Sequence, residues 1–448
     1  MIKIIIFCLA KIIFLFYVAK RLGGMKLNRI VKLGLCHALL MGSLVMPVLP
    51  FTSSVAQAAT SSGVSIMLDG YALPFPVQPV AIKGTTMVPF RAISEALGIN
   101  VQWNQASKTI TATKKEATTT KKVVLTMGST QATVDGRTVS LALAPQTISN
   151  NTMIPLSFFS QQFGAGVQWN QATKTVSITS PQEDLYTMGF YALSSYDERA
   201  MIPDFDTMAF GWSRIDLNGK FTIADTGKEY RWPQSAGADT PESIIQNTAT
   251  QGTSPYLMVY AVDGHGELTK NLEDLTLQQQ TIKGIVDTAT QKGFKGIVLD
   301  FEGLGLTGDK LQAQKDYNAF IKNIATQAHQ KNLKLTVVLH PLNSSYQGYD
   351  YRTLGTLADD IIIMAYAYDN EKSPEPLAKV DEAITLALKQ INKNKLILGI
   401  SLGSENADSV NAKIGLAKRY DLKGISIWRL GIVGQAAWNT MHESIEFK

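Results

Sequence analysis

From Leu185 onward, short apolar runs alternate with segments whose apolar residues recur about every 3.6 positions. The runs predict eight strands, at Tyr186–Ala192, Thr207–Trp212, Tyr256–Ala261, Gly296–Phe301, Lys334–Leu339, Ile361–Tyr366, Leu396–Ser401 and Gly424–Trp428. The helical segments are Leu275–Gln291, Leu311–Gln330, Leu377–Ile391, Ser409–Tyr420 and Ala436–Ile445. This rhythm and length are typical of a single (β/α)8 TIM barrel in the α/β class. An open doubly wound sheet is the alternative, but no Gly-x-Gly-x-x-Gly or phosphate loop follows the first strand.

The fourth strand ends in two acids and then breaks at Gly303. Because strand side chains alternate between faces, Val298, Asp300 and Glu302 share one face. A lone Asp-x-Glu at a strand end also fits carboxylates that cap a helix or contact water. In a barrel, however, active sites lie at the carboxyl ends of the strands. Asp300 and Glu302 are therefore expected to converge with Tyr366 and Trp428, which end the sixth and eighth strands.

An internal repeat precedes the barrel. The segment from Val88 to Ile110 returns from Ile154 to Val176, with a constant offset of 66 residues. Each copy predicts a strand, a short helix (Phe90–Leu97 and Leu156–Phe163), a glycine turn and a hairpin around Trp-Asn. Asp-Gly turns lie upstream of both helices, also 66 residues apart. We therefore expect a small duplicated α+β domain over residues 64–180, followed by the barrel over residues 185–448.

The repeat resembles the copper amine oxidase N-terminal-like domain, which often occurs on exported, wall-associated proteins of Gram-positive bacteria. The segment contains no His and no Cys, so the resemblance implies no copper site. Trp103 and Trp169 fit either a pair of sugar-stacking residues or core anchors, and their equivalent repeat positions favour core anchors. We interpret this domain as an attachment or spacing domain, with the bacterial cell wall as its partner.

The first 58 residues have the pattern of a leader. After Met25, basic residues, an apolar stretch and Ala56-Gln57-Ala58 follow in the order of a secretory signal peptide, with cleavage expected before Ala59. Translation from Met25 would make residues 1–24 an artefact of gene calling; a membrane anchor is the alternative. The prediction is a secreted protein associated with the cell wall or spore envelope.

The positions of the cysteines agree with export, and the net charge bears on whether nucleic acid is a partner. Cys8 and Cys36 both lie in the leader, so the exported part has no thiol chemistry or disulfide. Removing residues 1–58 leaves 35 of the 42 Lys and Arg against 37 Asp and Glu. A charge of about −2 remains, which gives no indication of nucleic-acid binding.

The barrel resembles glycoside hydrolase family 18. Gly296–Glu302 is similar to the end of that family's Asp-Gly-x-Asp-x-Asp-x-Glu signature, Met364-Ala365-Tyr366 to its sixth-strand Met-x-Tyr, and Trp428 to its eighth-strand Trp. Gly189-Phe190-Tyr191 matches a first-strand aromatic. Without room for a large insertion between the seventh and eighth strands, the chain looks closest to the bacterial wall and spore-cortex type, rather than to the large chitinases.

The resemblance implies a secreted hydrolase that cuts β-1,4 links beside N-acetylglucosamine, in peptidoglycan or chitin, without cofactor or metal. In this substrate-assisted mechanism, the acetamido oxygen of the sugar attacks the anomeric carbon. Glu302 is implied as acid and base, Asp300 as the residue that orients the acetamido group, and Tyr366 as its hydrogen-bond donor. Trp428 is implied as the floor of the sugar site.

Three more aromatic residues and one histidine are candidate residues of the sugar site. Tyr191, Trp212 and Tyr368 are candidate sugar platforms, with core packing as the alternative for Trp212, while His340 is expected to line the cleft.

Lys295 and Val298 replace two acids of the signature, and Ala367 replaces an Asp that often follows the sixth-strand Tyr. Either Asp369 substitutes for that Asp through a local bulge, or the contact is lost. A weak or inactive barrel that binds amino-sugar polymers, as a lectin does, is therefore the alternative function.

Overall fold

The computed structural model describes residues 64–115, 119–369 and 371–448. The predicted leader, including the start at Met25 and the cleavage before Ala59, lies outside these ranges. No helix in the described ranges is both long and apolar enough to cross a lipid bilayer.

The duplicated segment forms three small sheets with one short helix in each repeat. The helices are α3 (Phe90–Ala96) and α4 (Leu156–Gln162), at the two positions that the repeat predicts. The strands are β1 (Ser65–Leu68), β2 (Tyr71–Ala72), β3 (Val80–Ile82), β4 (Thr85–Pro89), β5 (Asn100–Asn104), β6 (Thr109–Lys115), β7 (Thr120–Thr126), β8 (Gln131–Val134), β9 (Arg137–Ser140), β10 (Gln146–Ile148), β11 (Asn151–Pro155), β12 (Gly166–Asn170) and β13 (Thr175–Thr179). They pair in the orders β12-β13-β1-β2, β10-β11-β4-β3 and β5-β6-β7-β8-β9.

The two repeat tryptophans do not anchor this domain's core. Trp103 is 41% exposed and Trp169 is 47% exposed, whereas Ile93 and Phe159 from the two helices are fully buried. The expectation that the tryptophans are core anchors is therefore wrong. Each indole shares a strand face with a valine that packs against the core, Val101 on β5 and Val167 on β12, but two residues further along the indole itself is left exposed.

The second segment is a closed parallel barrel, as predicted. Its strands run in the ring order β14-β22-β21-β20-β19-β18-β17-β15, and β14 also pairs with β15. They are β14 (Tyr186–Tyr191), β15 (Thr207–Ile215), β17 (Ser254–Val262), β18 (Gly296–Glu302), β19 (Lys334–Leu339), β20 (Asp360–Ile363), β21 (Leu396–Ser401) and β22 (Gly424–Trp428), with β16 (Phe221–Thr222) antiparallel to β15.

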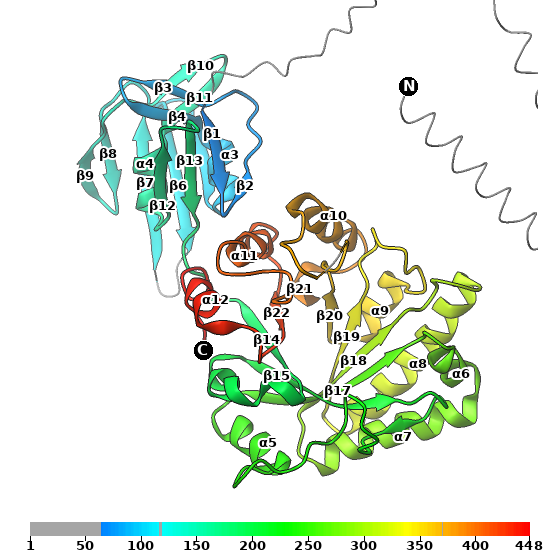
Figure 1. The fold of residues 1–448 in the computed structure, drawn as a ribbon. Helices are drawn as coiled ribbons and strands as arrows, with labels where there is room; N and C mark the ends of the chain where they lie inside the picture. The colour runs from blue at the N-terminus through cyan, green and yellow to red at the C-terminus, as the bar shows by residue number, and fades with distance from the viewer. Residues whose placement is uncertain (1–63, 116–118, 370) are drawn as a thin grey trace, which may run out of the picture. The chain divides into compact units, whose positions relative to one another are not determined.

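Helices surround the strands (Figure 1). They are the 3-10 helix η1 (Leu193–Asp204), α5 (Pro241–Thr250), α6 (Glu267–Glu273), α7 (Leu275–Gln291), α8 (Lys310–Gln330), α9 (Tyr351–Leu357), α10 (Leu377–Leu388), η2 (Lys393–Lys395), α11 (Val410–Arg419) and α12 (Gly434–Met441). The sixth strand was predicted to extend to Tyr366, but β20 ends at Ile363, and Tyr366 follows in a loop.

Strand alternation divides the barrel's apolar residues into an inner and an outer core. Val298 joins the inner cluster, together with Met258 and Val338 from the neighbouring strands. Ile297 and Leu299 join the outer cluster, between the strands and the helices. The face assignment for the fourth strand is therefore correct, and it directs the two acids toward the barrel interior.

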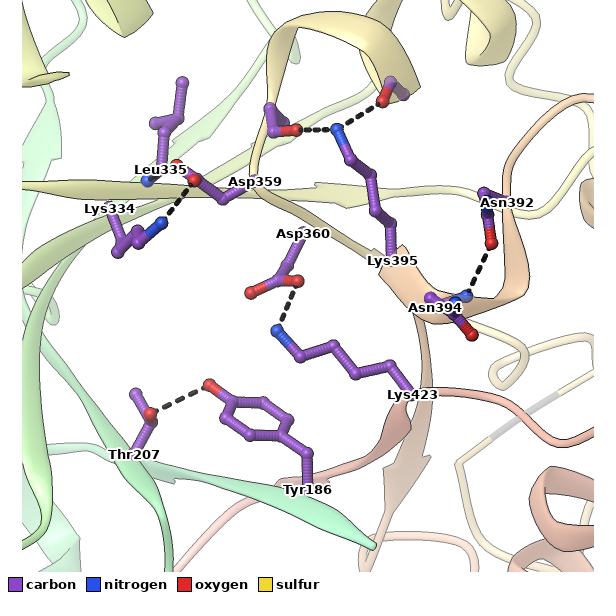
Figure 2. A network of polar contacts seen from close by, with 12 residues as sticks. Tyr186, Thr207, Lys334, Leu335, Asp359, Asp360, Asn392, Asn394, Lys395 and Lys423 are labelled. Atoms are coloured by element: carbon purple, nitrogen blue, oxygen red, sulfur yellow. Dashed lines mark hydrogen bonds and ion pairs between the residues drawn. The ribbon is translucent and has the colours of Figure 1, made fainter.

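The amino ends of the strands are joined by polar side chains (Figure 2). Asp360, at the start of β20, pairs with Lys423 just before β22. The Tyr186 hydroxyl at the start of β14 donates to Thr207 at the start of β15. These contacts close the barrel at the end opposite Asp300 and Glu302, which indicates a role in stability.

Candidate active site

Asp300 and Glu302 end β18 at the carboxyl rim of the barrel. In the parallel ladder Asp300 lies beside Tyr260 of β17 and Val338 of β19. Asp300 is 4% exposed, whereas the Glu302 side chain is 28% exposed. One acid is thus enclosed by the barrel and the next reaches its mouth.

The surroundings of both acids favour their neutral forms. Burial raises the pKa of Asp300 well above its usual range, and the adjacent Glu302 charge raises it further. Burial raises the pKa of Glu302 to about 7, with an additional contribution from the charge of Glu371. A carboxyl that is half protonated near neutral pH is suited to both donating and accepting a proton.

Val298 explains why the inner acid is so poorly solvated. It is fully buried directly below Asp300 on the same face, where an apolar side chain offers no hydrogen bond. Within the described ranges, Oδ1 of Asp300 has no hydrogen-bond partner. Oδ1 of Asp300 can therefore gain a hydrogen bond only from a ligand that enters through the barrel mouth.

Tyr366 packs against the inner cluster of the barrel, although it lies beyond its strand. Besides burial, the charges of Asp300 and Glu302 raise the pKa of its phenol. Its ring leans against Gly399 of β21, where an added Cβ would lie 3.1 Å from Cε1 of the tyrosine. The glycine thus makes room for the ring at the barrel mouth.

A buried glutamate fixes the loop that carries Tyr366. Ala367 adopts a left-handed conformation with φ of 57°, which is unusual for a residue with a Cβ. The Glu375 carboxylate accepts hydrogen bonds from the Ala367 N–H at 2.8 Å and the Tyr368 N–H at 3.4 Å. The Glu375 N–H donates to Glu405, which forms a buried ion pair with Lys413 at 2.9 Å. Sequence reasoning missed Glu375, because its role depends on a turn that the apolar pattern did not reveal.

Trp428 completes the wall opposite β18. It is the last residue of β22, half-buried, and packs edge-on against Phe190 with ring centroids 5.3 Å apart. Both residues belong to or border the inner cluster. The indole therefore lies at the barrel mouth, as the strand-end argument predicted.

His340 lies beside Glu302 but does not form an ion pair with it. Its Nε2 is 3.8 Å from Glu302 and accepts a hydrogen bond from the Gly303 N–H at 3.4 Å. Burial lowers the pKa of the imidazole to about 4. At neutral pH the ring is uncharged, and it stacks on Tyr346. It lines the cleft as an acceptor, in agreement with the predicted polar lining.

Two further tyrosines face the acids. Tyr230 and Tyr260 stack with ring centroids 4.1 Å apart, and charges from Asp300 and Glu302 add to burial in raising their pKa values. Strand parity would have identified Tyr260, which is paired with Asp300. Tyr230 comes from the β16–α5 connection, and Arg214 holds its carbonyl at 3.0 Å. A neighbouring cavity of about 600 Å³ extends the site beyond these rings.

Tyr191 and Trp212 do not lie in the cleft. They are 3% and 1% exposed and pack against each other in the outer core, with ring centroids 5.9 Å apart. The prediction that they are sugar platforms is therefore wrong. Phe190 precedes Tyr191 on the strand and faces inward, so the adjacent tyrosine faces the helices.

Tyr368 and Asp369 are also engaged elsewhere. The Tyr368 hydroxyl hydrogen-bonds to Asn343 at 3.0 Å, and its ring lies under Lys379 against the outer core. The Asp369 side chain is 72% exposed and pairs with Lys379 at 3.7 Å. Asp369 therefore does not supply the missing acid, and of the acids in this loop it is Glu371 whose charge acts on Glu302. No group of three or more potential metal ligands occurs among the residues described.

In this closed (β/α)8 barrel a carboxyl pair lies at the carboxyl end of one strand, where the active sites of barrel enzymes are found. The family model for glycosyl hydrolases family 18 matches residues 168–404, and the model for the copper amine oxidase N-terminal domain matches residues 67–178. Because the first match covers more than half of the chain, the chain belongs to glycosyl hydrolases family 18.

Individual relatives are distant. The chain is 23% identical over 235 residues to the cortical fragment-lytic enzyme of Bacillus subtilis (strain 168), covering 37% of this chain and 53% of the relative. It is 27% identical over 211 residues to the enzyme of the same description from Bacillus anthracis, covering 41% and 48%. The chain thus spans about half the length of these curated relatives.

The similar solved structures also have low sequence identity to this chain. The spore cortex-lytic enzyme SleL of Bacillus cereus is matched at 19% identity with a TM-score of 0.48, over 60% of this chain and 76% of that one. A chitinase from Chromobacterium violaceum is matched at 21% identity with a TM-score of 0.48, over 58% and 98%.

Proposed function

We propose that the protein is a secreted, wall-associated hydrolase that cleaves β-1,4 links beside N-acetylglucosamine in peptidoglycan, including spore cortex, or in chitin. The main support is Glu302, whose pKa is raised to about 7 at the barrel mouth next to a buried, unpartnered Asp300. The wall as substrate is favoured by the described activity of the cortical fragment-lytic relatives.

The proposed reaction uses the substrate's own amide as nucleophile. The acetamido oxygen attacks the anomeric carbon while Glu302 donates its proton to the departing glycosidic oxygen, which leaves with the bonding electrons. The resulting oxazolinium ion is then opened by water, and Glu302 takes the water's proton. The products are two sugar chains, and the anomeric configuration is retained.

The other site residues have distinct proposed roles. Asp300 accepts a hydrogen bond from the acetamido N–H, which gives its unpartnered Oδ1 a ligand. Tyr366 donates to the acetamido oxygen, and Trp428 stacks under the sugar ring. Tyr230 and Tyr260 extend this aromatic lining toward the 600 Å³ cavity.

The N-terminal domain, over residues 64–180, is proposed to attach the barrel of residues 185–448 to the wall. Retention of the full chain on purified peptidoglycan, compared with a fragment of residues 181–448, tests this attachment. Equal retention of the two would remove the assignment.

A specific observation supports the second candidate function. Val298 takes the place of an inner acid of the family signature, and Oδ1 of Asp300 has no hydrogen-bond partner among the described residues. A barrel with this defect binds amino-sugar polymers with little or no turnover. Binding without release of reducing ends across acidic to neutral pH would favour this alternative.

The deciding experiment measures reducing ends released from spore cortex, vegetative wall and chitin by the protein and by Glu302→Gln. We expect release from at least one substrate, with loss of about 10² to 10⁴-fold in the variant. Mass spectrometry of the products identifies the link that is cut. Undiminished release by Glu302→Gln would rule out the proposed mechanism.

A further inference from the structure

The N-terminal domain presents two half-exposed indoles in equivalent settings. Trp103 and Trp169 are 41% and 47% exposed, which is unusual for the largest apolar side chain. Their Nε1 atoms donate to Gln105 and Gln171, each at 2.8 Å. The polar edge of each indole is therefore satisfied within its own turn, and the apolar ring remains presented to solvent.

The backbone below each indole is held in the same way. The Asn104 side chain accepts hydrogen bonds from the backbone N–H groups two and three residues later, at 3.0 and 3.1 Å. Asn170 makes the same two bonds at the same distances. A ring on a fixed turn loses little conformational freedom when it binds a ligand.

Each indole lines a groove, and the two grooves are related by the 66-residue repeat. The first groove, of about 470 Å³, contains Pro89, Asn151 and Thr152; the second, of about 740 Å³, contains the equivalent residues Pro155, Thr85 and Thr86. Each groove thus combines the tryptophan of one repeat with the hairpin of the other.

The central strand pair explains this exchange. β4 and β11 are antiparallel, and their register is Met153 with Pro89, Ile154 with Val88, and Pro155 with Met87. Shifting each residue by 66 positions maps this register onto itself, so an approximate twofold axis passes between Val88 and Ile154. The two grooves are symmetry-related copies.

We propose that the two tryptophan grooves are equivalent binding sites for a chain of β-linked 2-acetamido sugars. An indole face stacks on the apolar C–H face of a pyranose ring, and the polar groove residues hydrogen-bond its hydroxyl and amide groups. Two like sites suit a ligand that repeats. The choice of amino sugars rests on the proposed function of the barrel, and peptidoglycan and chitin share this chemistry.

Binding at both grooves would strengthen attachment to one polymer chain. When one groove binds a polymer, a neighbouring segment is held near the second groove at high effective concentration. Loss of one indole is then expected to weaken binding strongly, and loss of both to weaken it further.

The test uses the full chain carrying Glu302→Gln, so that bound polymer is not cut during the measurement. Co-sedimentation with purified peptidoglycan and, separately, with chitin compares Trp103→Ala, Trp169→Ala and the double variant. We expect each single change to weaken binding to at least one polymer by about tenfold, and the double change by about 10² or more. Trp103→Tyr should retain most of the affinity, because it keeps an aromatic face.

Leu311→Ala is the matched control, because this leucine is a 76% exposed apolar residue on the barrel. Unchanged binding by the double tryptophan variant, with circular dichroism showing it folded, would overturn the proposal. So would a change confined to self-association in sedimentation velocity. Hydrolysis by the chain with Glu302 intact is measured separately, and its absence would count against the proposed reaction while leaving the binding result valid.

Discussion

Glu302 gains its chemical suitability from two features of its surroundings. The barrel buries it, and Glu371 adds a negative charge from the loop after β20. Both favour the protonated carboxyl, whereas His340, being neutral, does not oppose them. The residue is therefore a proton donor up to about pH 7.

We predict that the alkaline limb of the kcat/KM profile has a midpoint near pH 7. Above that pH the general acid is deprotonated and the leaving oxygen receives no proton. In Glu371→Gln the limb should move to lower pH, because a charge that raises the Glu302 pKa is removed. Initial rates on a soluble amino-sugar oligomer between pH 4 and 9 measure this shift. Asp369→Asn, an exposed acid in the same loop, is the control and should leave the midpoint in place.

The raised pKa of Glu302 also predicts that the folded protein loses stability as the pH rises. The folded-state pKa of Glu302 is about 7 against 4.5 for the ordinary group, so the folded state binds more protons between these values. Stability from this group is full below about pH 4.5 and is lost as pH rises through about 7. Relative to Glu302→Gln, the protein should lose up to about 3 kcal/mol between pH 4.5 and 8. Urea unfolding at both pH values measures the difference, and a variant that gains nothing at pH 8 would contradict the burial argument.

At the scale of elements, the loop after β20 determines where Tyr366 lies. The strand ends at Ile363, and a left-handed residue at Ala367 turns the chain. Glu375 stabilises that turn through two backbone N–H groups. The phenol therefore depends on a carboxylate nine residues further along the chain.

We predict that Glu375→Ala lowers both stability and kcat. It leaves two backbone donors unsatisfied, at a cost of about 1–3 kcal/mol. Displacement of the Tyr366 loop by about 1 Å should lower kcat by roughly 10²-fold. Glu375→Gln keeps one acceptor oxygen and should recover much of both. Steady-state kinetics and thermal unfolding of the two variants test this, and equal kcat for Ala and the parent would dismiss the positioning role.

At the scale of the whole molecule, the N-terminal domain and the barrel have separate sets of buried apolar residues. The apolar residues of the N-terminal domain form one cluster, and those of the barrel form an inner and an outer cluster. Because no single core is shared, the barrel holds its catalytic geometry with its own residues.

We therefore predict that a fragment of residues 181–448 folds and cleaves a soluble amino-sugar oligomer with unchanged kcat. On insoluble wall its rate at low protein concentration should fall by about tenfold or more, because attachment is lost. Parallel assays on both substrates distinguish these outcomes. An equal fall on the soluble substrate would show that the N-terminal domain contributes to the barrel's site.

The sequence by itself determined the barrel, the repeat, and the convergence of Asp300, Glu302 and Trp428. These features depend on local periodicity and on the alternation of side chains between the two faces of a strand, and both can be recognised from neighbouring residues.

Only the tertiary structure decided what depends on residues far apart in the chain. The Glu375 bonds to the Tyr366 loop, the stacking of Tyr230 on Tyr260, and the action of Glu371 on Glu302 each join different segments. The pairing of the two tryptophan grooves likewise required the register of β4 with β11. Such long-range contacts follow from packing of the whole chain, for which no short stretch of sequence carries a signal.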